Sequence, residues 1–186
     1  LFWNNNTNRW LCNMKYSRTP SSGSKNIVPF PKFQYPHSAK PNFNLLFTPS
    51  GFFEIQTIFP KDIATQAFKE LMLIGQHYKL YPSICGIKRH KSDSSYLSFA
   101  NDGLSISWCF SLNGITSKQR DEYCKKLIDV VLNNDGKTYL AKHPYFTKDQ
   151  FQLMYPNYKK ILEMKIKHDP DCLFSSGAMQ RLLLDD

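Results

Sequence analysis

The chain has 186 residues, of which 41% are hydrophobic and 15% aromatic, which is typical of one folded domain with a real core and excludes a disordered tail. The formal net charge of +9 could indicate nucleic acid, but the basic residues are scattered, and those at 125–126 and 159–167 fall on expected helices whose other faces are apolar. We interpret them as solvated helix faces; an anionic substrate or an acidic membrane surface is the alternative.

Cysteine and histidine spacing gives no indication of a metal site. The five cysteines contain no Cys-x-x-Cys pair, and the five histidines have no metal-ligand spacing, so we predict neither a metal nor a disulfide scaffold. The chain begins at Leu1 without a basic and apolar leader, and no apolar run is long enough to cross a membrane. We therefore expect a piece of a longer protein, in the cytoplasm or at a membrane surface, with no membrane span of its own.

Residues 1–49 are rich in Asn, Pro, Ser and Lys and have poor periodicity. Ser21 to Ser24 predict a flexible loop. A strand over 30–35 is possible, and the prolines around it would confine it to a sheet edge.

From residue 51 the pattern is clearer. A strand is predicted over 52–58, with Phe53, Ile55 and Thr57 on one face. Pro60 and Asp62 then open a helix, whose apolar stripe consists of Ile63, Ala67, Leu71 and Ile74. Candidate strands follow at 83–89 and 95–101, around a polar loop.

The clearest strand runs over 104–112, where Leu104, Ile106, Trp108, Phe110 and Leu112 alternate with Ser105, Ser107, Cys109 and Ser111. Thr116 or Ser117 caps the next helix, with the stripe Tyr123, Leu127, Val130 and Val131. The order strand, helix, strands, helix, strand predicts an α+β fold with an antiparallel, ferredoxin-like (split βαβ) sheet and both helices on one face.

The last fifty residues are predicted to form a short strand and two helices. Asp135-Gly136 is a turn, 137–141 is a strand, and Lys142 emerges at the end of that strand. Thr147 caps a helix, a second helix begins near Pro156, and Asp169-Pro170 ends it.

These residues also carry a family motif. The series Tyr-Leu-Ala-Lys (139–142), Phe-x-x-Met-Tyr-Pro (151–156), a lysine-rich helix, Asp-Pro, Leu-Phe-x-Ser and Arg-Leu-Leu resembles the C-terminal end of FAD-linked oxidoreductases of the vanillyl-alcohol-oxidase type, most closely the decaprenylphosphoryl-ribose oxidase branch. Aldonolactone oxidases, which share the layout, are the alternative, although they carry His-Trp-Gly/Ala-Lys at the first motif.

The resemblance implies a division of the chain. Residues 1–136 would be the substrate-binding (cap) domain, and 137–186 a segment that returns to an N-terminal FAD-binding domain missing from this chain. The complete enzyme would oxidise a secondary hydroxyl of a sugar or sugar-lipid by hydride transfer to FAD, bound mainly by the missing half.

The resemblance also assigns roles to single residues. Lys142 would lie beside the flavin and the reacting carbon, where a cation stabilises developing negative charge, and Tyr139 would touch FAD. The substrate would be bound by Gln56, Lys88, Ser105 and Ser107. The last two stand where bacterial ribose oxidases carry Asn and Cys, which leaves the exact substrate open; Cys109 shares their face without an assigned role.

Two other classes of protein remain as alternatives. A ferredoxin-like binding module would have the same strand order, because fold does not fix function, but it would lack Tyr139 and Lys142 facing a common open pocket. A single-stranded nucleic-acid binder would expose sheet aromatics such as Trp108 and Phe110. Burial of these two rings under the helices would remove the second alternative.

Overall fold

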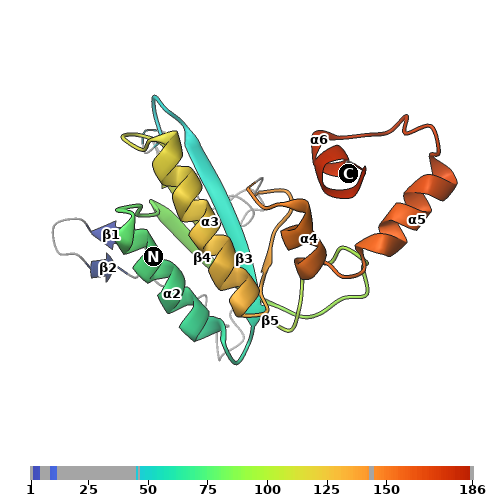
Figure 1. The fold of residues 1–186 in the computed structure, drawn as a ribbon. Helices are drawn as coiled ribbons and strands as arrows, with labels where there is room; N and C mark the ends of the chain where they lie inside the picture. The colour runs from blue at the N-terminus through green and yellow to red at the C-terminus, as the bar shows by residue number, and fades with distance from the viewer. Residues whose placement is uncertain (1, 5–8, 12–44, 46, 143–144, 185–186) are drawn as a thin grey trace, which may run out of the picture.

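A computed structural model describes residues 2–4, 9–11, 45, 47–142 and 145–184 of the protein (Figure 1). The loop predicted at 21–24 and the edge strand predicted at 30–35 lie outside these residues. The elements, in chain order, are β1 (Phe2–Asn4), β2 (Arg9–Leu11), β3 (Phe52–Pro60), α2 (Ala64–His77), β4 (Ile84–His90), β5 (Gly103–Ser111), α3 (Ser117–Asn133), β6 (Lys137–Thr138), α4 (Lys148–Met154), α5 (Tyr158–His168), α6 (Gly177–Met179) and the π-helical turn η2 (Gln180–Leu184).

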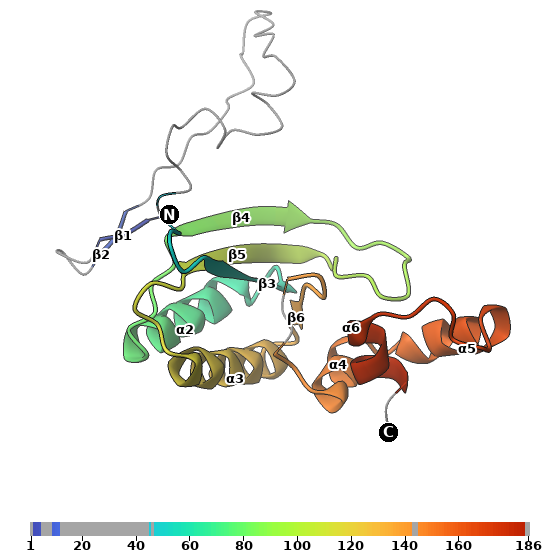
Figure 2. The same ribbon diagram turned by 90° about the horizontal axis from the view of Figure 1, so that it is seen from above.

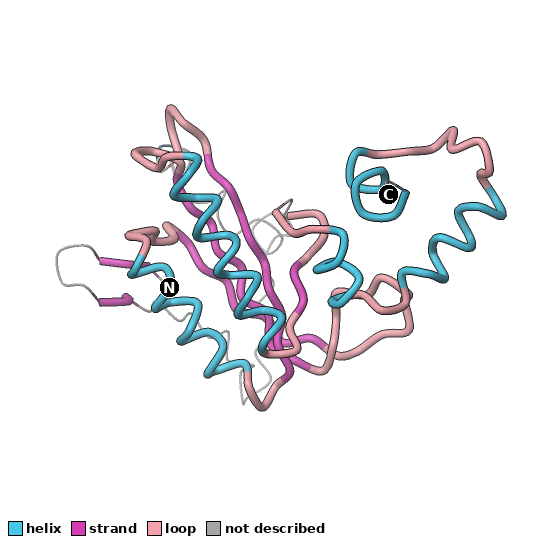
Figure 3. The backbone as a smooth tube through the Cα atoms, in the orientation of Figure 1, coloured by secondary structure: helices cyan, strands magenta, loops and turns pink. Residues whose placement is uncertain are grey.

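The main sheet has four strands in the order β4-β5-β3-β6, and every neighbouring pair is antiparallel. Strand β5 lies between β3 and β4, which are joined through α2, so the predicted split βαβ arrangement is confirmed. Strands β3 and β5 pair over their whole length, from Phe52 opposite Ser111 to Pro60 opposite Gly103. This long pair of strands forms the centre of the sheet (Figure 3).

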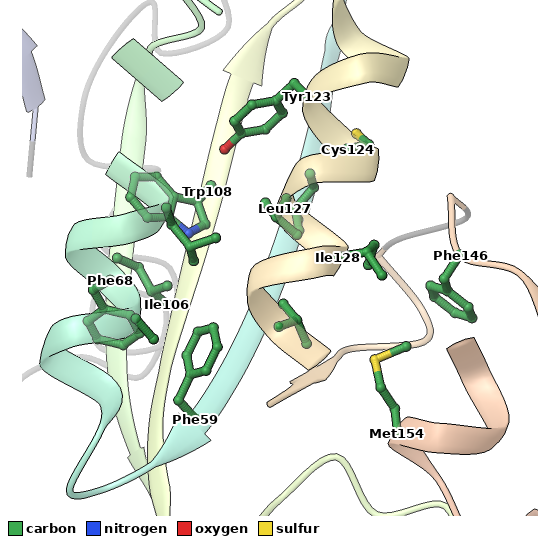
Figure 4. Close-up of a cluster of buried hydrophobic side chains, with 14 of the residues drawn as sticks. Phe59, Phe68, Ile106, Trp108, Tyr123, Cys124, Leu127, Ile128, Phe146 and Met154 are labelled. Atoms are coloured by element: carbon green, nitrogen blue, oxygen red, sulfur yellow. The ribbon is translucent and has the colours of Figure 1, made fainter. Parts of the chain in front are cut away.

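Helices α2 and α3 cover one face of this sheet, as predicted (Figure 2). The core lies between the two layers and includes the alternating apolar residues of β5 (Figure 4). Leu71 of α2 and Leu127 of α3 are 1% and 0% exposed, and Trp108 is 2% exposed beneath them. Ile74 and Val130, at the edges of the predicted stripes, are only half-buried and pack against the core.

Helices α3 and α4 begin at the predicted caps, Thr116 and Thr147. The Thr116 hydroxyl accepts a hydrogen bond from the backbone N–H of Gln119 at the start of α3. Thr147 and Gln150 form a reciprocal capping box at the start of α4. Each cap satisfies N–H groups that a helix leaves unpaired, which is why these helices begin where the sequence indicates.

The strand predicted at 95–101 is wrong. This segment folds back on itself, because the Asp93 carboxylate accepts a hydrogen bond from the Ser95 N–H and the Ser95 carbonyl accepts one from the Ser98 N–H. Short polar side chains that bond to nearby backbone in this way compete with sheet pairing. The segment is therefore a loop between β4 and β5.

The strand predicted at 137–141 is much shorter than expected. Strand β6 contains only Lys137 and Thr138, and the Lys142 N–H then bonds to the Tyr139 carbonyl at 3.0 Å. That bond closes a turn, and the turn ends the pairing with β3. Lys142 thus stands on a turn rather than at a strand end.

The segment after β6 extends away from the sheet (Figure 1). Phe151 and Met154 of α4 are buried, but α5 has no buried residue. Leu173 and Phe174, in the connection to α6, are 80% and 81% exposed. No described helix is both long and apolar enough to cross a membrane.

Candidate functional site

The face of the sheet opposite α2 and α3 is polar. Register places Glu54 opposite Cys109 and Gln56 opposite Ser107, on the face that the core residues of β5 do not share. The central strand β5 contributes only small side chains here, whereas its neighbours contribute longer ones, including Lys88 of β4. The result is a shallow trough along the sheet.

A pocket of about 550 Å³ occupies one end of this trough. Its lining combines two cationic side chains, one carboxylate and several apolar groups: Phe47, Phe52, Glu54, Ile84, Cys85, Gly86, Lys88, Ser107, Cys109 and Lys142. Gly86 leaves room in the middle of β4, since a Cβ placed there would meet nothing within 4 Å. The pocket therefore offers charge and hydrogen bonds on one side and apolar surface on the other.

Glu54 connects two strands and a turn within this pocket. Its Oε1 accepts a hydrogen bond from Lys142 Nζ at 2.6 Å and another from the Ser107 hydroxyl. The side chains of Lys142 and Glu54 are 31% and 26% exposed, so the pair is partly shielded from water yet open to the pocket. The cation at residue 142 is thereby held over β3 and β5, 88 residues away in the sequence from its partner.

A second polar cluster lies further along the same face. Gln56 Nε2 donates to Ser105 Oγ at 3.3 Å, and His90 Nε2 lies 2.8 Å from the same oxygen. Burial, with Lys88 and Arg89 nearby, lowers the pKa of His90, so the neutral ring can accept a hydrogen bond from the Ser105 hydroxyl. Gln56 and Ser105 are 5% and 0% exposed, which marks this cluster as an internal support of the trough floor.

Tyr139 continues this face beyond Gln56. Its backbone N–H donates to the Gln56 carbonyl at 2.8 Å, and its ring lies 5.2 Å from that of Phe99, centroid to centroid. The side chain is 38% exposed. An exposed aromatic ring thus stands on the same face as the pocket, three residues before Lys142.

The two cysteines that line the pocket are held as neutral thiols. Burial, reinforced by the charge of Glu54 and opposed by Lys142, raises the pKa of Cys109 to about 11. Burial likewise raises the pKa of Cys85 to about 12. Because the thiolate is the nucleophile, neither residue suits nucleophilic catalysis near neutral pH.

The predicted site residues thus fall into two neighbouring groups on one face. Lys142, Lys88 and Ser107 line the pocket, whereas Gln56 and Ser105 bond to each other next to it and Tyr139 flanks them. The sequence analysis missed Glu54, His90 and Gly86. The alternation of β3, which places Glu54 on the face of Gln56, was the available indication. No cluster of three metal-ligating side chains occurs among the described residues.

The fold and the site together define a class, an antiparallel α+β domain with one face covered by helices and a charged ligand pocket on the other. No protein-family profile matches the chain. A curated protein that it resembles is the decaprenylphosphoryl-beta-D-ribose oxidase of Mycolicibacterium smegmatis, with 25% identity over 154 residues, which are 82% of this chain and 32% of that protein. The chain is therefore distantly similar to an oxidase over most of its length, and it spans about a third of that relative.

Proposed function

We propose that this chain is the substrate-binding part of an FAD-dependent oxidoreductase that oxidises a secondary hydroxyl group of a sugar or sugar-lipid. The single observation that carries the proposal is the placement of Lys142, whose ammonium group is fixed by Glu54 at the edge of an open pocket. The similarity to an oxidase over 82% of the chain supports it. An aldonolactone oxidase is the alternative within the same class.

The proposal includes a division of labour along the chain. Residues 1–136 would form the substrate domain, and 137–186 would return to an FAD-binding domain outside this sequence. The apolar side chains exposed after β6 support such a docking role, because large exposed apolar groups mark interaction sites. They are Leu153, Met164, Ile166, Leu173 and Phe174.

The open face suits the ring end of a flavin better than its phosphates. Tyr139 offers an exposed ring, and Lys142 offers a cation three residues away, both on the pocket side of the sheet. The sequence has no Gly-rich phosphate loop, so we infer that the pyrophosphate is bound by another domain. When bound, FAD would supply the acceptor for the hydride.

The chain's own residues would bind and orient the substrate. Ser107, Glu54 and Lys88 offer hydrogen bonds to sugar hydroxyls, and bidentate or multiple contacts of this kind fix a reacting carbon in place. Phe47, Phe52 and Ile84 provide apolar surface for the remainder of the molecule. Lys142 would stabilise the negative charge that the flavin would gain as it accepts the hydride. A fixed cation in a partly shielded site needs little reorganisation to do so.

The test uses the complete enzyme with flavin bound, mixed without oxygen with free pentoses, pentose phosphates, pentosyl phospholipids and aldonolactones. Bleaching of the oxidised flavin by a pentose derivative, faster than by any lactone, would support the proposal. Faster bleaching by a lactone would support the alternative. A folded protein that binds these compounds but contains no flavin would instead indicate a binding module.

The nucleic-acid alternative loses its supporting feature in this structure. Trp108 and Phe110 are 2% and 0% exposed beneath α2 and α3, so neither ring can stack on a base.

A further inference from the structure

We propose that Glu54 is a positioning residue, which sets where the Lys142 ammonium group lies in the pocket. This inference rests on the proposed function for its catalytic meaning, but its geometric content can be tested separately. It concerns a side chain that neither the motif at 139–142 nor the similarity to the oxidase assigns.

The residue that holds the cation lies in a continuous strand ladder. Glu54 pairs with Cys109 of β5, and β3 pairs with β6 only further along, at Thr57 and Ile58. The Ser107 hydroxyl, diagonally across from it on β5, donates to the same Oε1 atom that accepts from Lys142. The Ser107 contact therefore fixes the direction of this carboxylate independently of Lys142.

Lys142 itself has little local support. Its backbone follows a strand of only two residues and a turn, and the side chain has several rotatable bonds. In residues 47–142 and 145–184, Glu54 is the acceptor found for its ammonium group. Without that carboxylate, nothing in the described part of the chain would direct the cation to the pocket.

The Lys142–Glu54 pair differs from an ion pair on the outer surface of α3. Lys126 and Asp129 pair on the outer side of α3 at 60% and 53% exposure, as solvated surface groups do. The Lys142–Glu54 pair is about half as exposed and lines the pocket with the Ser107 contact in place. Its position at a ligand site, rather than its strength, is what indicates a role.

The experiment measures the accessibility of Lys142 in the complete protein by brief acetylation followed by mass spectrometry. Lys69, exposed on α2 at the opposite face, is the internal reference. In Glu54→Gln the Lys142/Lys69 labelling ratio is expected to rise about three- to tenfold, because the amine is no longer held by the charge-assisted hydrogen bond to the carboxylate and becomes accessible to the reagent. Glu54→Asp, one methylene shorter, should give an intermediate ratio.

Glu163→Gln, on the exposed surface of α5, is the matched control and should leave the ratio unchanged. A ratio in folded Glu54→Gln within about 1.5-fold of wild type would overturn the inference. Should Glu54→Gln fail to fold, Glu54→Asp decides by the same criterion, with an unchanged ratio again counting against it.

A second measurement links position to chemistry. In flavin-loaded enzyme, Glu54→Gln should slow flavin reduction by about tenfold, and Glu54→Asp should recover part of that loss. A raised labelling ratio with an unchanged rate of flavin reduction would support the positioning role and count against a catalytic Lys142. An unchanged ratio with intact substrate oxidation would overturn the positioning role and leave the proposed function standing.

Discussion

The Tyr155 hydroxyl donates a hydrogen bond to the Thr138 carbonyl oxygen at 2.6 Å, and both residues are buried. Tyr155 lies just after α4, whereas Thr138 is the last residue of β6. This contact ties the C-terminal segment to the edge of the sheet, four residues before Lys142. It therefore links the position of the C-terminal segment on the sheet edge to the position of Lys142, the candidate catalytic residue.

Tyr155→Phe should lower the free energy of unfolding by about 1 kcal/mol, because it removes one buried hydrogen bond without leaving a large cavity. Denaturant titration measures the loss. Tyr158→Phe is the control, since that half-buried ring packs on Phe151 and should change stability by less than about 0.5 kcal/mol. Equal effects of the two substitutions would contradict the anchoring role of Tyr155.

Lys142→Ala should reduce the rate of flavin reduction in the complete enzyme by about a hundred- to a thousandfold, as expected when one fixed charge-stabilising group is removed. Lys142→Arg should restore only part of the rate, because a planar fork replaces a compact ammonium group. Stopped-flow absorbance measures both, with Lys69→Ala on the opposite layer as control. A Lys142→Ala rate within about threefold of wild type would remove the catalytic role.

Leu71→Ala should lower the free energy of unfolding by about 2–5 kcal/mol, because this side chain is 1% exposed between α2 and the sheet. Leu127→Ala, 0% exposed on α3, should cost a similar amount. Leu73→Ala is a control on the same helix as Leu71, since Leu73 is 63% exposed and its truncation should be nearly neutral. Melting midpoints that do not separate Leu71→Ala from Leu73→Ala would be inconsistent with this packing.

Cys109 should react slowly with iodoacetamide at pH 8, since its pKa is raised to about 11 and only about one thousandth of the thiol is ionised there. Its labelling rate should rise about tenfold per pH unit between pH 8 and 10, because the folded-state thiol loses its proton only as the pH approaches 11. Exposed Cys172 provides the comparison within the same sample. Fast labelling of Cys109 at pH 8 would contradict the burial that raises the pKa of this thiol.

The 186-residue chain, purified by itself, should not retain flavin. Tyr139 and Lys142 would contact only the ring system, and so few contacts do not offset the entropy lost when a large cofactor is fixed. Visible absorption of the purified chain measures this directly. A yellow preparation would show that the dinucleotide is bound here after all.

Much of this fold could be predicted from local patterns. Strict alternation over 104–111 predicted both faces of β5, and the spacing of Leu71 and Leu127 predicted which helix stripes are buried. Thr116 and Thr147 predicted helix starts, because capping depends on residues only three positions apart. These features are encoded over short stretches of sequence.

The wrong and missed predictions arise where hydrogen bonds within a turn compete with sheet pairing, or where the two partners of a contact lie far apart in the sequence. Residues 95–101 have strand-like composition, but the Asp93 and Ser95 turn bonds prevail over sheet pairing. Glu54 had no role in the sequence-based prediction, because its partner Lys142 is 88 residues away. Only the three-dimensional arrangement brings that pair together.

The alternation of β5 gives its two faces separate roles, one in the core and one in the trough. Ile106, Trp108 and Phe110 decide whether the domain folds, whereas Ser105, Ser107 and Cys109 face the opposite side. Enlarging Ser107 or Cys109, which are partly exposed, would reshape the trough without entering the core on the other face, whereas Ser105 is fully buried and hydrogen-bonded. Single substitutions at those two positions could therefore change which molecules fit the pocket, as long as every second residue of the strand stayed apolar.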